Sequence, residues 1–158
     1  MSMFTYNLTL ATEEPLERVR DRVSAFFPEV EWTNGEANLG GWIVVVSSPS
    51  TYQPSVLYAN EMLGRSATAE VSFLVSKGLD VEADRRIWDR VLQVSAELIH
   101  SCDAVASMEY LESMVMTRAP GAPIVLYEWF PGALTAERLD RLAHVGIDFT
   151  VTGPRRAT

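Results

Sequence analysis

Cysteine is nearly absent from the chain, because Cys102 is the single cysteine among 158 residues. One cysteine cannot form an intrachain disulfide, and such scarcity is typical of proteins from a reducing compartment. Long apolar runs are also missing: stretches such as residues 42–46 fall far short of the roughly 20 apolar residues that a membrane helix needs. The first residues lack the basic region and apolar core of a secretory signal. We therefore expect a cytoplasmic protein with no membrane partner.

Positive charge is scarce as well. Thirteen basic residues stand against twenty-one acidic ones, so the formal net charge is −8. A chain this acidic repels phosphate backbones, and we expect no binding to nucleic acid. A basic protein is the complementary partner, because opposite fields speed association and orient the encounter. The alternative is that the negative surface only keeps the protein soluble.

Length and composition indicate a folded chain. With 47% hydrophobic and 22% charged residues, the chain has more apolar side chains than disordered proteins have. A length of 158 residues suits one domain, since two domains would each have a small core. We expect a single domain over residues 1–152 and a frayed tail over residues 153–158.

Hydrophobic periodicity predicts strands where apolar residues alternate and helices where they recur every three or four residues. Turns are expected at Asn34-Gly35 and, with type II geometry, at Pro120-Gly121. The expected strands cover residues 3–11, 30–33, 38–47, 68–75, 104–117 and 124–129, and the expected helices lie within residues 12–28, 80–102 and 135–144. Short links between neighbouring strands favour an α+β fold: a mainly antiparallel sheet with two main helices packed on one face, plus a short C-terminal helix capped by Thr135.

Residues 48–67 interrupt this pattern and contain two Ser/Pro-rich stretches, at residues 48–50 and 54–55. A connection of this length inside a compact domain is usually functional. Tyr52 and Tyr58 have no periodic partner there, and Glu61 lies close by. Exposed tyrosines beside carboxylates are favoured at protein interfaces, so we expect these three residues to bind a partner protein. The alternative is that the segment folds back and buries the tyrosines.

Residues with catalytic potential do not form a recognisable constellation. His100 and His144 lie near the ends of expected helices, where they compensate the helix dipole. Cys102 continues the apolar stripe of its helix, which is typical of a core residue. No histidines or cysteines have zinc-site spacing, and no phosphate-binding loop is present. We therefore predict no enzyme activity, no metal site and no cofactor.

Several segments together resemble the Sit-type immunity proteins, which protect bacteria against toxins delivered by kin. The resemblance includes FTYNLTLAT at residues 4–12, Leu63-Gly64, TAEVSFLVSK at residues 68–77, residues 103–105, the hairpin through Arg118 and Gly121, and the segment around Trp129. The turn at residues 118–123 contains two prolines, unlike the usual Arg-x-x-Gly turn of that family, and the final helix does not align with it.

The resemblance implies a cytoplasmic protein that binds and neutralises a cognate toxin. It assigns no toxin-contacting residues. A toxin that attacks nucleic acid is basic, so a nuclease is a partner that an acidic inhibitor suits.

Two other interpretations remain open. In the first, the chain is a small-ligand-binding domain or an enzyme with a pocket between sheet and helices. Met108, Met114 and Met116 would then line one surface of the pocket, because alternate residues of a strand share a face. Otherwise the methionines fill the core. The second interpretation is a homodimer formed through a sheet edge.

Overall fold

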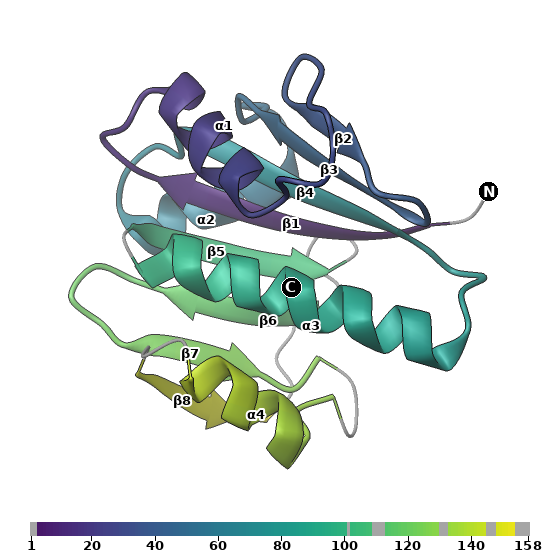
Figure 1. Ribbon diagram of the computed structural model, residues 1–158. Helices are drawn as coiled ribbons and strands as arrows, with labels where there is room; N and C mark the ends of the chain where they lie inside the picture. The colour runs from purple at the N-terminus through teal and green to yellow at the C-terminus, as the bar shows by residue number, and fades with distance from the viewer. Residues whose placement is uncertain (1–2, 101, 109–112, 130–132, 145–147, 154–158) are drawn as a thin grey trace.

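The computed structural model describes residues 3–100, 102–108, 113–129, 133–144 and 148–153, without the side chains of residues 106–108. Within these ranges, strands and helices alternate along most of the chain (Figure 1). The elements are β1 (Met3–Ala11), α1 (Leu16–Ala25), β2 (Glu36–Asn38), β3 (Trp42–Ser47), α2 (Pro54–Leu63), β4 (Ala69–Ser76), α3 (Val81–His100), β5 (Asp103–Met108), β6 (Ser113–Arg118), β7 (Ile124–Tyr127), α4 (Ala136–Ala143) and β8 (Phe149–Thr152).

The described strands form one eight-stranded sheet in the order β2-β3-β4-β1-β5-β6-β7-β8. Every neighbouring pair is antiparallel except β7 and β8, which are parallel. The first strand, β1, therefore lies inside the sheet, with β4 on one side and β5 on the other. This arrangement confirms the predicted α+β class with a mainly antiparallel sheet.

Helices cover both faces of this sheet. In Figure 1, α1, α3 and α4 lie on the near face and α2 lies behind the sheet. The expected pairing of two main helices on one face agrees with α1 and α3. The sequence analysis missed α2, which occupies much of the segment expected to be a connection. The first Ser/Pro stretch, residues 48–50, lies in a connection as expected, but the second starts a helix, with Pro54 in its first turn and Gly64 as the left-handed C-cap (φ 70°).

Side chains from β1 and α3 join at the centre of the main core. The Tyr6 hydroxyl donates to Ser95 Oγ at 2.9 Å, and the Ser95 hydroxyl donates to the Val91 carbonyl at 2.7 Å. Tyr6 is fully buried and contacts the rings of Phe73 and Trp88. Burial raises the pKa of Tyr6 well above the usual value for tyrosine, so its hydroxyl remains a donor at any physiological pH.

Arginines connect α3 to its neighbours. Arg90 donates to the Phe26 carbonyl just after α1 and stacks on the Phe27 ring, 4.5 Å from its centroid. Arg118, at the end of β6, donates to the carbonyls of Ile99 and His100. The last turn of α3 thereby obtains donors that a helix C-terminus otherwise lacks.

The segment expected as one long strand over residues 104–117 is two strands, so that prediction was wrong. β5 and β6 pair antiparallel, and a register shift lies between Ala106 and Ser107. The extra residue in β6 rotates the strand, so Met114 packs in the cluster with α2 while Met116 packs in the main core. The methionines therefore do not share a face as the pocket interpretation requires, and the Met108 side chain lies outside the described residues.

The predicted turns agree with the structure better than the predicted strand partners do. Asn34 and Gly35 both have positive φ, and Thr33 and Glu36 exchange two backbone hydrogen bonds, as in a type I′ turn. That turn closes an isolated bridge, whereas the hairpin of β2 and β3 turns around Gly40-Gly41. The type II turn is confirmed, because Gly121 has φ 74° and Ala122 N donates to the Ala119 carbonyl.

Helix starts also differ between expectation and structure. Thr135 caps α4 as predicted, accepting from Arg138 N at 3.1 Å. The first helix was expected within residues 12–28, but α1 begins at Leu16 with Pro15 as its N-cap. The Thr12 hydroxyl accepts from Glu14 N in the turn before the helix. In α3, Asp80 accepts from Ala83 N at 2.8 Å, as expected for a carboxylate at a helix N-terminus.

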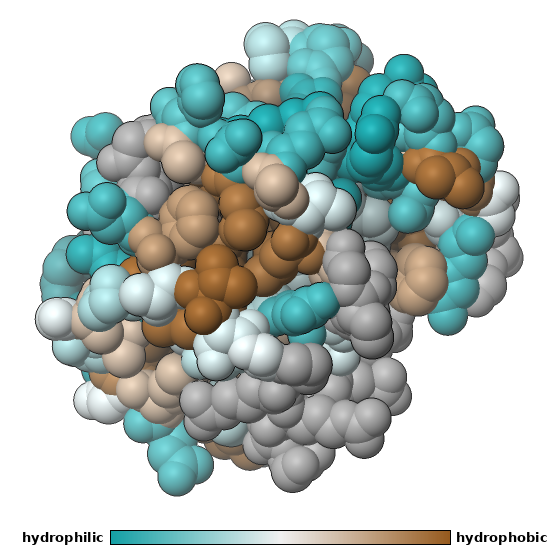
Figure 2. Space-filling model, turned by 90° about the horizontal axis from the view of Figure 1, so that it is seen from below, coloured by the Kyte–Doolittle hydropathy of each residue, from teal (hydrophilic) through white to brown (hydrophobic). Residues whose placement is uncertain are grey.

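The strand β8 was not predicted from the sequence and forms one edge of the described sheet. Phe149 packs against the main core, but Val151 is half-exposed at 50%. Figure 2 shows an apolar patch on the face seen from below, the side on which β7, β8 and α4 lie in Figure 1. A homodimer through a sheet edge remains a prediction. Of the expected C-terminal tail, residues 154–158 lie outside the described residues.

The Tyr6–Ser95 contact predicts a specific stability loss. Tyr6→Phe removes one buried hydrogen bond and keeps the ring, so we expect the free energy of unfolding to fall by about 1 kcal/mol. Tyr52→Phe is the matched control, because Tyr52 is 89% exposed, and it should change stability by less than about 0.5 kcal/mol. Urea unfolding of both variants measures the difference; equal effects would contradict this role of Tyr6.

Candidate functional site

The outer side of α2, together with Tyr52 in the turn just before it, presents an aromatic and acidic surface. We call Tyr52, Leu57, Tyr58 and Glu61 the α2 surface. Tyr52 is 89% exposed and Leu57 is 54% exposed. Glu61 is exposed one helical turn after Leu57, so the two side chains share a face.

The three residues predicted to bind a partner are thus placed differently. Tyr52 and Glu61 are exposed, as the interface hypothesis requires, whereas Tyr58 is half-buried and packs against the core beneath α2. The segment does fold back onto the sheet, but it does not bury Tyr52. Leu57 belongs to the same surface and was missed, because its significance depends on α2 being a helix.

The α2 surface lies on a well-anchored helix. Ala59 and Leu63 pack with Val105, Met114 and Tyr127 in a core cluster of their own. Just after α2, Arg65 donates to the Ala11 carbonyl at 2.8 Å and lies 3.5 Å from both Glu13 and Asp103. These contacts hold α2 against β1 and β5, so its outer side chains have a fixed platform.

A buried polar cluster lies on the face of β1 and β4 that points away from α1 and α3. The Ser72 hydroxyl is 2.9 Å from Asn7 Oδ1 and 3.5 Å from Glu70 Oε1. Asn7 Nδ2 and Glu70 Oε2 are buried without a hydrogen-bond partner among the described residues. Burial raises the pKa of Glu70 above the usual value for a glutamate, because the charged form loses its hydration.

The thiol and imidazole groups do not assemble into a catalytic arrangement. Cys102 is 7% exposed, its Sγ lies 3.2 Å from the Leu98 carbonyl, and burial raises its pKa to about 11. A thiol in this state is protonated at neutral pH and is a poor nucleophile. His144 Nδ1 lies 2.8 Å from the Asp140 carbonyl at the end of α4. Within the described ranges, no group of three His, Cys, Asp or Glu residues is arranged to hold a metal ion.

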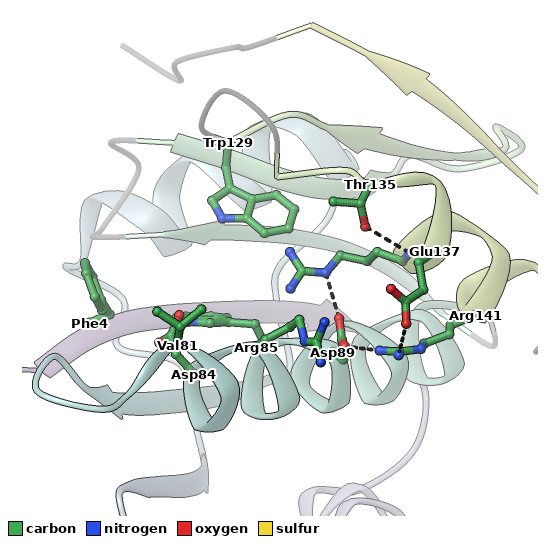
Figure 3. Close-up of a pocket in the computed structure, with 11 residues that line it drawn as sticks. Phe4, Val81, Asp84, Arg85, Asp89, Trp129, Thr135, Glu137 and Arg141 are labelled. Carbon is green, nitrogen blue, oxygen red and sulfur yellow. Dashed lines mark hydrogen bonds and ion pairs between the residues drawn. The ribbon is translucent and has the colours of Figure 1, made fainter.

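A cavity of about 430 Å³ opens between α3 and α4 (Figure 3). Trp129 and Thr135 border it on one side, Val81, Arg85 and Asp89 of α3 border the other, and Phe4 closes one end. The volume falls in the range of small-molecule sites, and aromatic walls with a few converging polar groups are typical of such sites.

Ion pairs give this cavity a defined polar side. Asp89 accepts from Arg138 Nε at 2.7 Å through one oxygen and from Arg141 through the other. The side chains of Asp89 and Arg138 are 14% and 12% exposed, so this pair is largely shielded from water. Arg138 also donates to the Ala133 carbonyl and lies over the Trp129 ring, 5.8 Å from its centroid.

Sequence reasoning did not find this cavity. Trp88 is 7% exposed and belongs to the main core, but it also lines the cavity. Val81, Arg85 and Asp89 are spaced four residues apart, so the sequence alone could have placed them on one face of a helix. The opposite wall comes from α4 and from Trp129, about forty residues further along the chain, and periodicity carries no information about that approach.

Comparisons with known proteins do not assign this chain to a family. No protein-family model matches the chain, and no curated protein or solved structure is significantly similar to it. In the part of the chain that the structure describes, no helix is long and apolar enough to cross a membrane.

The buried Glu70 predicts a pH-dependent stability. Because the pKa of Glu70 is raised on folding, the native state binds this proton more tightly than the unfolded state. Protonation of Glu70 therefore stabilises the folded state below the pKa of the unfolded chain, and this stabilisation is lost as pH rises through the pKa of the folded state. Glu70→Gln should therefore be more stable than the parent protein at pH 7, with a smaller difference at pH 4. Urea unfolding at both pH values tests this, with the exposed Glu17→Gln as control; a difference independent of pH would contradict it.

The state of Cys102 predicts slow chemical modification. At pH 8, we expect a thiol-specific disulfide reagent to react with the folded protein at least about 100-fold more slowly than with the urea-unfolded chain. Absorbance of the released thiolate gives both rates. Similar rates in the two states would show an accessible, ionised thiol instead.

Proposed function

We propose that this protein is an immunity-type inhibitor, which binds and neutralises a toxin protein through the α2 surface. The observation that carries the proposal is the placement of Tyr52, 89% exposed beside a helix that is firmly packed. Large aromatic side chains on a rigid support are the anchors that protein interfaces favour, because they bury much area at a small entropy cost.

Charge supports a basic partner. Near the C-terminal end of α2, the residues described above include three carboxylates, Glu13, Glu61 and Asp103, but one arginine, Arg65. The whole chain has a formal net charge of −8. Such a field speeds the approach of a cationic protein and orients it before contact. A toxin that acts on nucleic acid has this charge, and an acidic, aromatic surface competes with its substrate.

The proposal is tested by coexpression with the product of the adjacent gene. We expect a stoichiometric complex that survives about 0.5 M salt, where exposed charges are screened and apolar contacts are not. Tyr52→Ala should weaken the complex at least about tenfold, because it removes the central anchor. Calorimetry measures the affinity, and rescue of growth measures neutralisation. The absence of a complex and of toxicity in the neighbouring product would remove the proposal.

Reversing the charge of Glu61 tests electrostatic steering separately from the contact made by Tyr52. Glu61→Lys should slow association and reduce its salt dependence, because the local field is reversed where the partner docks. Glu17→Lys is the matched control: it changes the net charge equally, but Glu17 is exposed on α1, across the sheet from α2. Stopped-flow association at two salt concentrations compares them, and equal slowing by both variants would exclude docking at α2.

A further inference from the structure

The cavity between α3 and α4 has more hydrogen-bond donors than acceptors. Each arginine offers five N–H donors, and Arg85, Arg138 and Arg141 all line the cavity. The carboxylates that line it are already engaged. Asp89 accepts from two arginines, Glu137 accepts from Arg141, and Asp84 accepts from the Trp88 indole at 3.2 Å.

Unused donors remain at a largely buried position. Arg138 places Nε on Asp89 and Nη1 on the Ala133 carbonyl, but its Nη2 donates to no described residue. At the mouth of the cavity, the Arg85 side chain is 47% exposed and pairs with Glu82, itself 65% exposed. That exposed pair is worth little, so Arg85 is available to turn toward a ligand.

The opposite part of the cavity is apolar. Phe4, Trp88 and Trp129 form its aromatic walls, and Val81, which is 85% exposed, stands at the rim. Removing an apolar ligand from water against such walls is favourable by about 25 cal/mol for each Å² buried. A ligand that matches both parts has a compact apolar body and one anionic group.

We propose that this cavity binds a small amphipathic carboxylate, with its apolar body against Trp88 and Trp129 and its charge at Arg85 and Arg138. The guanidinium plane offers paired donors that match the two oxygens of a carboxylate. The site goes beyond the proposed toxin binding and is independent of it, because α2 lies on the other face of the sheet (Figure 1).

The test uses three naphthalene probes of similar shape: 2-naphthoate, 2-naphthylmethanol and 2-naphthylmethylammonium. We expect calorimetry to show 2-naphthoate binding at least tenfold more tightly than either of the others. Arg85→Ala should reduce that preference several-fold. Arg86→Ala is the matched control, because it removes the same charge from the next residue, which does not line this cavity.

Each remaining outcome overturns the assignment. Equal binding of 2-naphthoate and 2-naphthylmethanol would show that the cavity binds the apolar ring and does not recognise the anion. Preference for the ammonium probe would assign recognition to the carboxylates instead. Equal losses in the Arg85→Ala and Arg86→Ala proteins would reduce the effect to net charge, and no binding of any probe at millimolar concentration would remove the site.

Discussion

Burial of both faces of β1 is the constraint on which the rest of the structure depends. One face carries Tyr6, Leu8 and Leu10 into the main core, and the other carries Thr5, Asn7 and Thr9, each less than a tenth exposed. The apolar face is covered by the layer that contains α1 and α3. The polar face is also removed from water, so its hydrogen bonds must be satisfied within the protein, and Asn7 and Ser72 do so in part.

This sandwiching of the sheet separates two surfaces of different chemistry. The α2 surface offers an exposed tyrosine in the turn just before α2 and, on the helix itself, a leucine and a carboxylate. The cavity on the other face offers aromatic walls and guanidinium groups. Because the sheet lies between them, the proposed toxin and the proposed carboxylate would bind on opposite faces of the sheet.

Local patterns predicted the parts of the fold that depend on neighbours in sequence. The strand at residues 3–11, the helix after Asp80, the type II turn at Pro120-Gly121 and the Thr135 cap were all found because period, caps and turn residues act over a few positions. Tyr52 and Glu61 are exposed as predicted, but Tyr58 is half-buried, because the segment expected to be a connection contains α2. What failed depended on distant partners. The bulge opposite Ala106 divided the methionines. The strand β8 was missed although its residues FTVT alternate, because four residues are a weak signal without their parallel partner β7.

The central position of β1 has a consequence for synthesis of the chain. Residues 3–11 precede both of their hydrogen-bonded neighbours in the chain, which are residues 69–76 on one side and 103–108 on the other. During synthesis, neither backbone edge of β1 is occupied until residues 69–76 have been made. During that interval both backbone edges of β1 are open to pairing with other chains. The helix α1 follows β1 directly in the chain and is the first element available to cover its apolar face, whereas its edges stay open until β4 and β5 have been made.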